Sequence, residues 1–199
     1  MVMPRGRPRS FDRDEALRSV MEVFWAKGYD CTQLTDLTAA IGVTPPSFYA
    51  AFGSKEAAFR EAVALYKETV GAAFPKALES GKTTCDSIRA MLEASIDVAV
   101  SAPRSAGCLL ITGALNGLPE NDPLSELLRQ NRQENIARIR VRLERGLADG
   151  DIPPESDIPV LARFYGSIIQ AISMQARDGM SRKELKAGVA PALAALCPQ

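Results

Sequence analysis

Histidine is absent from this 199-residue sequence, and its absence excludes several kinds of site. Without histidine there is no Ser-His-Asp or Cys-His catalytic group and no His-ligated metal centre. The overall charge gives no indication of a nucleic-acid partner, because 24 basic residues balance 24 acidic ones. We therefore expect no enzyme of these classes, no metal and no cofactor.

Cysteines are also sparse, and long apolar runs are missing. The four cysteines, Cys31, Cys85, Cys108 and Cys197, form no CxxC pair, which indicates free thiols in a reducing cytosol rather than a disulfide framework. No apolar run approaches the ~20 residues that cross a bilayer, and the N-terminal MVMPRGRPR lacks the apolar core of a signal peptide. We expect a soluble, cytoplasmic protein without a membrane partner.

The alternating Val-Ile-Thr-rich runs that are typical of strands do not occur. Hydrophobic residues make up 46% of the chain, and most are Ala, Leu, Ile and Val that recur every three or four positions. This content is sufficient for a sizeable core. The predicted fold class is all-α, with about nine helices.

The stretch 34–55, LTDLTAAIGVTPPSFYAAFGSK, predicts two short helices joined by a tight turn. Thr35 is a candidate N-cap for the first helix, and Gly42 ends it because glycine accepts a left-handed conformation at little cost. Thr44 then caps the second helix, with Pro45 at its first position, where a missing N–H does no harm.

The second short helix has two different faces. Phe48 and Phe52 fall on one side and are expected in the core, whereas Ser47 and Tyr49 fall off that side. Two short helices, a glycine-containing turn and an exposed face of small polar residues are typical of a DNA-reading helix-turn-helix.

The segment TDLTAAIGVTPPSFYAAFGSKEAAF resembles the motif of the TetR/AcrR (tetracycline-repressor-like) family of bacterial transcriptional regulators. The resemblance covers roughly residues 10–60, and the rest agrees only in length and helical character. It implies a three-helix helix-turn-helix domain with a basic N-terminal arm over residues 1–60. A long helix would join this domain to an effector-sensing and dimerisation domain over residues 61–199.

The resemblance also implies which residues face double-stranded DNA. Those of the second short helix and its cap are Thr44, Pro45, Pro46, Ser47 and Tyr49. Tyr49 and Lys55 are suited to phosphate, and Thr35 is expected to bind phosphate through its hydroxyl and the helix N-terminus. Since this helix offers no Arg, Asn or Gln, we expect modest base discrimination, supplemented by DNA shape.

The N-terminal arm contains Arg5, Arg7 and Arg9 before the first acidic residue, Asp12. Extended arginines fit the narrow minor groove of A·T-rich DNA, so this segment resembles the core of an AT-hook. The alternative is a solvated basic tail.

Beyond the helix-turn-helix, Ser54 is predicted to cap a connecting helix of about 20 residues that runs to Pro75. The charge-rich helix 124–147 is most simply explained by a solvated face. Two final helices, about 157–178 and 181–196, are apolar over a wide arc. They fit either an internal core or a two-fold dimer, and the resemblance favours a homodimer through these last two helices, which would read a pseudo-palindromic operator.

The family's C-terminal domain usually holds a pocket for a small-molecule effector. Apolar residues that would line such a pocket, or simply form the core, are Met91, Leu92, Leu109, Leu110, Leu115, Phe164, Tyr165 and Ile168. Cys108 follows Gly107 at a predicted helix start, where the helix dipole and free N–H groups would stabilise a thiolate. It is therefore either a sensor of thiol-reactive signals or an inert buried residue.

Three functions remain open. The first is a homodimeric, sequence-specific DNA-binding regulator, a repressor released from a palindromic operator by a small-molecule or thiol-reactive signal. The second is a thiol-dependent enzyme using Cys108, which the lack of histidine and of an adjacent general base disfavours. The third, suggested by the arginine arm, is a helical DNA-architectural protein without an effector.

Overall fold

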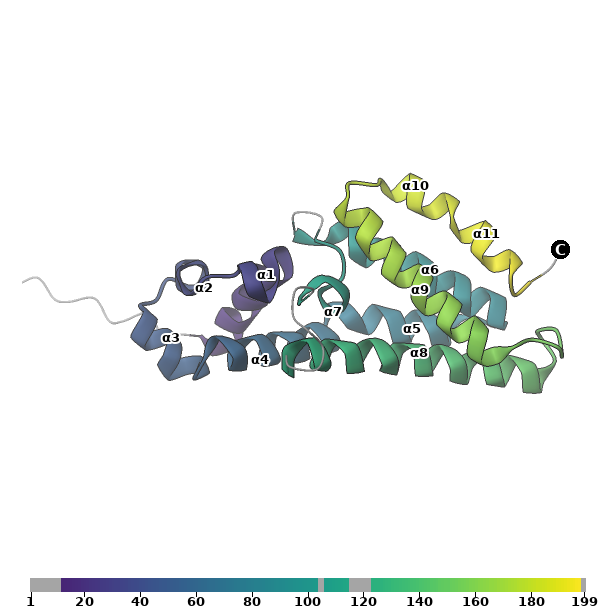
Figure 1. Ribbon diagram of the computed structural model, residues 1–199, viewed down its shortest axis with the longest axis horizontal. Coiled ribbons are helices and arrows are strands. Elements are labelled where there is room, and N and C mark those ends of the chain that lie inside the picture. Colours follow the sequence, from purple (N-terminus) through teal and green to yellow (C-terminus); the bar gives the residue numbers. More distant parts are fainter. Residues whose placement is uncertain (1–11, 104–105, 115–122, 198–199) are drawn as a thin grey trace, which may run out of the picture.

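A computed structural model describes residues 12–103, 106–114 and 123–197, and regular structure there is entirely helical (Figure 1). The helices are α1 (Arg13–Cys31), α2 (Leu34–Ile41), α3 (Pro45–Phe52), α4 (Lys55–Glu68), η1 (Val70–Ala72), α5 (Ala73–Ser80), α6 (Thr84–Ser101), α7 (Leu109–Thr112), α8 (Pro123–Asp149), α9 (Ile158–Arg177), α10 (Arg182–Ala187) and α11 (Val189–Ala194). Because η1 joins α4 to α5, and Gly188 alone separates α10 from α11, these segments amount to nine helices in the described ranges. The all-α prediction is confirmed. The predicted arginine arm and Leu115 lie outside the described residues.

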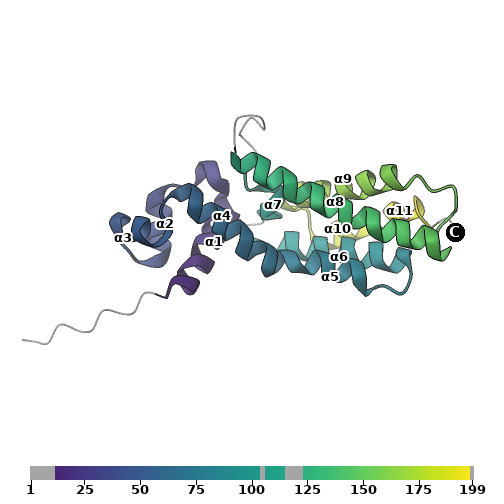
Figure 2. The ribbon, with the colours of Figure 1, turned by 90° about the horizontal axis from the view of Figure 1, so that it is seen from below.

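The molecule is elongated, with a head at one end and a helical body at the other (Figures 1 and 2). We call α1–α3 the head and residues 106–114, which include α7, the connector. One apolar core joins the head to α4, the connector and the first turns of α8, and a second fills the body between α5, α6, α8, α9, α10 and α11. Among the described helices, none is both long and apolar enough to cross a membrane.

The helix-turn-helix forms largely as its residues predict. Gly42 ends α2 with a φ of 68°, and Thr44 and Pro45 begin α3 as N-cap and first residue. Phe48 and Phe52 are 0% and 3% exposed, so the predicted core face is confirmed.

The predicted N-cap of α2 is wrong. Gln33 occupies that position, where its side chain and that of Asp36 form a reciprocal capping box, and Thr35 is the second residue of the helix. Glutamine is an uncommon N-cap, whereas threonine is a favoured one, so residue preference alone points to Thr35.

The predicted connecting helix is interrupted. Helix α4 ends at Glu68, and the 3-10 turn η1 joins it to α5. Pro75 lies in the first turn of α5, where its missing N–H has no intrahelical partner to lose, so it does not end a helix there.

The charge-rich helix α8 is not simply a solvated face. The Arg142 side chain is 2% exposed, and its Nε and Nη1 atoms donate to Ser87 Oγ (2.9 Å) and Thr84 Oγ1 (2.6 Å). Asp151 accepts from the Thr84 backbone N–H (2.7 Å) and lies 4.0 Å from Arg142 Nη2. This network compensates the buried charge and ties the end of α8 to the start of α6.

The expectation of four free thiols is also wrong. Cys85, near the start of α6, and Cys197, beyond α11, form a disulfide across a sequence separation of 112 residues, with their Cα atoms 6.4 Å apart. Cys31 and Cys108 are free. The separation in sequence concealed the pair, because only the return of the last helices to α6 brings the two residues together.

This disulfide should stabilise the fold by restricting the unfolded chain. Replacing Cys85 by serine is expected to lower the free energy of unfolding by about 2–5 kcal/mol, measured by urea denaturation without reductant. In dithiothreitol the variant and the wild type should converge. Cys31→Ser, which alters an exposed free cysteine, is the matched control and should leave stability unchanged. Equal stability of Cys85→Ser and wild type without reductant would contradict this role.

Candidate functional site

The DNA-facing residues predicted from sequence lie on an exposed, uncharged part of the head. The side chains of α2, α3 and their caps that are exposed as predicted are Thr35, Thr44, Pro45, Pro46, Ser47 and Tyr49. Tyr49 is 47% exposed although its neighbour Phe48 is fully buried. No charged residue occurs from residue 37 to 54, so charge attraction to phosphates has to come from flanking segments.

Lys55 is the first charged residue after this surface. Its Nζ lies 4.2 Å from the centre of the Tyr29 ring, a cation–π geometry, and the side chain is half-buried. The contact holds the ammonium group at the start of α4, close to the exposed surface of the head. A position for phosphate contact is therefore available, but Lys55 also has a structural partner that the sequence did not reveal.

The head donates two hydrogen bonds to backbone carbonyl groups of the connector. The Trp25 indole Nε1 donates to the carbonyl oxygen of Gly107 (2.6 Å), and the Tyr29 backbone N–H donates to the carbonyl oxygen of Gly113 (2.7 Å). A Cβ atom at Gly28, whose φ is 74°, would lie 3.3 Å from that second oxygen. The close approach of α1 to the connector therefore favours glycine at this position.

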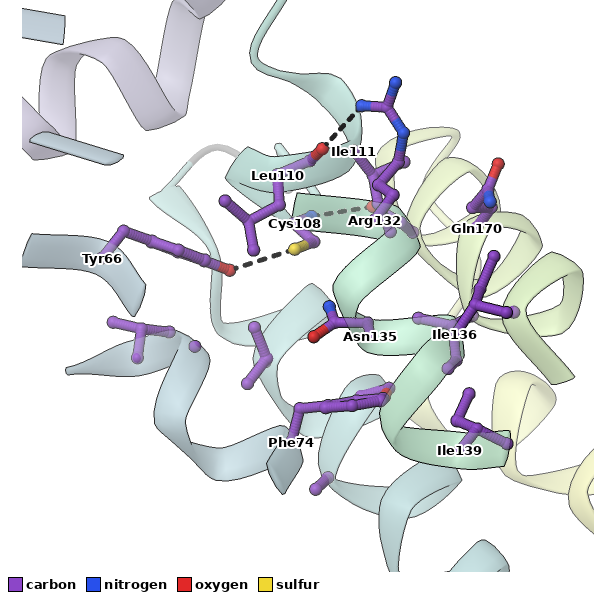
Figure 3. Close-up of a pocket in the computed structure, with 18 residues that line it drawn as sticks. Tyr66, Phe74, Cys108, Leu110, Ile111, Arg132, Asn135, Ile136, Ile139 and Gln170 are labelled. Carbon is purple, nitrogen blue, oxygen red and sulfur yellow. Dashed lines mark hydrogen bonds between the residues drawn. The ribbon is translucent and has the colours of Figure 1, made fainter. Parts of the chain in front are cut away.

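The same connector forms part of the wall of a narrow cavity in the body (Figure 3). The cavity lies between α4, η1, α5, α6, the connector, α8 and α9, and its lining is mainly apolar. Cys108, Leu110 and Ile111 face it from the connector, and Tyr66 faces it from α4. One short segment thus contacts the head on one side and the cavity on the other.

Cys108 links three elements around this cavity. The hydroxyl of Tyr66 on α4 donates to Cys108 Sγ (3.3 Å), and the Cys108 backbone N–H donates to Ser173 Oγ on α9 (2.7 Å). Burial raises the pKa of the Tyr66 hydroxyl well above its ordinary value, so the hydroxyl remains a donor across the physiological pH range.

The predicted stabilisation of a Cys108 thiolate is wrong. Burial raises the pKa of the Cys108 thiol, and hydrogen bonds from Tyr66 and the connector backbone oppose this only in part. The helix that follows, α7, has four residues, so it supplies little of the dipole that was expected. Since its pKa is raised, the partly buried Cys108 thiol stays protonated near neutral pH.

Most of the other predicted pocket residues lie elsewhere. Met91, Leu92, Leu109 and Tyr165 are 0% exposed in the apolar cores and do not line the cavity, whereas Leu110 does. The Tyr165 hydroxyl donates to the carbonyl oxygen of Ala192 (3.1 Å). Phe164 is 40% exposed on the outside of α9, and Ile168 packs half-buried against the body core without reaching the cavity.

The residues of α9 that line the cavity lie on a different face of the helix from those predicted. They are Gly166, Ile169, Gln170 and Ser173. From α8, Arg132 and Asn135 contribute polar groups to the cavity, although the charge-rich sequence of this helix predicted a solvated face for Arg132. No apolar pattern marks such residues, because a polar residue that faces a cavity has the same spacing as one that faces water. In the described part of the chain, no cluster of three or more His, Cys, Asp or Glu could hold a metal.

A three-helix head with an exposed recognition helix, joined to a larger helical body, defines the class of helix-turn-helix DNA-binding proteins. Comparison with known families makes this specific. The chain belongs to the tetR family of bacterial regulatory proteins, whose N-terminal domain matches residues 17–62, and a tetracyclin repressor-like C-terminal domain matches residues 84–195. The resemblance predicted from the motif is confirmed, and a member of this family of regulators is not an enzyme.

Individual relatives cover nearly the whole chain. The HTH-type transcriptional repressor ComR of Escherichia coli (strain K12) is 34% identical over 91% of this chain and 87% of its own length. A cysteine mutant of the TetR family transcriptional regulator CifR, complexed with 26-bp double-strand operator DNA, is 40% identical, with a TM-score of 0.87 over 94% of this chain and 98% of that one. A TetR transcriptional regulator from Chloroflexus aurantiacus is 27% identical, with a TM-score of 0.80 over 92% of each chain.

The pKa shift of Cys108 leads to a test of its environment. Because the pKa of the thiol is raised, alkylation by iodoacetamide should be slow at pH 7 and should accelerate at higher pH than for N-acetylcysteine. Tyr66→Phe removes a hydrogen bond that lowers this pKa, so it should slow the reaction severalfold at pH 8 and move the midpoint of the rate–pH curve upward. Mass spectrometry of the Cys108 peptide in a Cys31→Ser background gives the rate. An unchanged midpoint in Tyr66→Phe would show that the bond does not influence the thiol.

Proposed function

We propose that this protein is a cytoplasmic, homodimeric transcriptional repressor that binds a pseudo-palindromic operator and is released by a small-molecule or thiol-reactive signal received in the cavity. The observation that carries the proposal is the connector, which lines the cavity and accepts hydrogen bonds from the head. In this proposal residues 1–60 form the DNA-binding domain and residues 61–199 the sensing and dimerisation domain.

The head supports the DNA-binding part. The CifR mutant, which binds operator DNA, is 40% identical over nearly the full chain, and the E. coli relative ComR is a repressor. We propose that α3 enters the major groove, with Ser47 and the exposed prolines near base edges and with Tyr49, Lys55 and Thr35 at phosphates. Arg5, Arg7 and Arg9 of the arm would then follow the minor groove.

An unpartnered apolar face on the body supports a dimer. On α9, Val160, Phe164 and Met174 are 52%, 40% and 38% exposed, and on the adjacent α8 Val141 is 62% exposed. Helices α10 and α11 instead pack against α6 in the same chain. We therefore propose that each copy contributes α8 and α9 to a four-helix interface between two copies, and that α10 and α11 take no part in it.

The signal would travel through contacts that already exist. A molecule that fills the cavity presses on Cys108 and Leu110 of the connector and on Tyr66 of α4. The connector holds α1 through Trp25, and the rings of Trp25 and Tyr66 pack edge to face with their centres 5.1 Å apart. Displacing these groups changes the angle of the head, and two heads on one dimer then no longer match two half-sites.

Footprinting on DNA that flanks the protein's own gene tests this function. We expect one protected palindrome at physiological salt, with two half-sites about one helical turn apart or slightly more. Absence of a protected palindrome would refute a sequence-specific repressor. Uniform low-preference binding that no ligand or oxidant alters would instead indicate a DNA-architectural protein.

Tyr49→Phe is expected to weaken binding to all sequences alike, by roughly threefold to tenfold, because a phosphate contact carries no base information. Fluorescence anisotropy with the operator and with single-base variants measures both affinity and preference. Tyr165→Phe, which alters a hydroxyl buried in the body, is the matched control and should leave the affinity unchanged. A changed order of preference among the variants would show that Tyr49 reads bases.

Modification of Cys108 should imitate an effector. Its thiolate attacks methyl methanethiosulfonate, a new S–S bond forms, methanesulfinate leaves and the thiol proton passes to solvent. In a Cys31→Ser background the added S-methyl group should occupy the cavity, break the Tyr66 contact and lower operator affinity about tenfold or more. The same reagent should not affect Cys31→Ser combined with Cys108→Ser. Equal release of both proteins would exclude Cys108 as the route.

A further inference from the structure

We infer that the effector is a small, uncharged, largely apolar molecule with a single carbonyl or hydroxyl group, and that the side-chain amide of Asn135 on α8 recognises this group. The inference rests on the proposed function, since it specifies the ligand of the same cavity. It depends on which polar groups face the cavity and which of these already have partners.

Apolar side chains and the absence of carboxylates set the overall chemistry. No Asp or Glu is among the described residues that line the cavity, so a cationic ligand would lose its hydration without gaining an opposite charge. Phe74, Ile136 and Ile139 supply apolar surface from α5 and α8 (Figure 3). The body of a ligand that fits there is therefore apolar.

Arg132 is the single cationic residue among the described lining residues, and it is not directed at the cavity. Its Nη1 atom donates to the carbonyl oxygen of Leu110 (2.8 Å), and Figure 3 shows the guanidinium group turned toward that oxygen and away from Asn135 and Phe74. Burial lowers the pKa of this guanidinium. Because the guanidinium is turned away from Asn135, an anionic group bound beside Asn135 would not meet this charge, which favours a neutral ligand.

Three of the remaining polar lining groups already have hydrogen-bond partners. The Tyr66 hydroxyl donates to Cys108 Sγ (3.3 Å), and Ser173 Oγ accepts from the Cys108 N–H (2.7 Å). Ser95 Oγ donates to the carbonyl oxygen of Met91 (2.8 Å). These groups shape the wall of the cavity more than they offer free sites to a ligand.

The side-chain amides of Gln170 and Asn135 differ from them, and of the two only Asn135 is half-buried, because Gln170 is exposed. The Asn135 side chain projects from α8 into the space between Cys108 and Phe74 (Figure 3), and among the described residues its amide has no hydrogen-bond partner. An amide carries both a donor and an acceptor, so it complements a carbonyl or a hydroxyl group equally well. A ligand that pairs with it satisfies a polar group that the fold leaves open, while its apolar part contacts the surrounding side chains.

Matched five-carbon probes test the inference on the full-length protein. They are 2-pentanone, 2-pentanol, pentanoate and pentylamine, titrated at pH 7.5 by calorimetry and by thermal shift. We expect the ketone and the alcohol to bind and to raise the unfolding temperature, and the carboxylate and the amine to bind at least tenfold more weakly. Asn135→Leu should weaken binding of the ketone about tenfold, the loss expected for one hydrogen bond. Asn135→Asp should reverse the order and favour pentylamine, because it places a carboxylate in the cavity.

Gln133→Leu is the matched control, since it makes the same amide-to-alkyl change at an exposed position of the same helix and should leave binding unchanged. The inference is wrong if pentanoate binds more tightly than the ketone, if Asn135→Leu binds the ketone like the wild type, or if neither neutral probe binds. Operator anisotropy is recorded separately. Tight ketone binding without any loss of DNA affinity would refute the repressor mechanism and leave the ligand assignment standing.

Discussion

The hydrogen bond from the Trp25 indole to the carbonyl oxygen of Gly107 is the contact on which the relation between head and body depends. Helix α4 and a shared apolar core also join the two parts, but apolar contacts have no directional preference and fix the orientation of the head less closely than hydrogen bonds do. The attachment at the connector restricts this orientation, and the bond from Tyr29 to Gly113 reinforces it. The orientation of α3 is thereby determined by residues more than fifty positions away in the sequence.

The residues that attach the connector to α4 also line the cavity. Cys108 belongs to the connector, Tyr66 belongs to the helix that leaves the head, and a hydrogen bond joins them at the cavity wall. Ser173 extends this link to α9, the helix that carries the exposed apolar face. In the function we propose, recognition of a ligand, orientation of the head and pairing of two copies would therefore involve neighbouring side chains, which would allow coupling without large movements.

The sequence predicted well those features that local chemistry determines. The left-handed conformation of Gly42, the start of α3 at Pro45 and the burial of Phe48 each follow from a short stretch of chain. The features it missed depend on distant contacts. The Cys85–Cys197 pair, the buried Arg142 and the free amide of Asn135 become visible only when the last helices return to α6 and α8 packs against α9. Periodicity locates a helix, but it does not tell which of its polar residues faces a cavity.

The joint at Gly28 and Gly113 limits how the protein can be recombined with its relatives. Gly28 belongs to the head and Gly113 to the connector, and a Cβ atom at Gly28 would lie 3.3 Å from the carbonyl oxygen of Gly113. A chimera that transfers only the three head helices carries the indole and the glycine but depends on the recipient for a backbone of matching shape. The unit that can be exchanged intact is thus the head together with its connector, two segments that are distant in the gene but form one structural part.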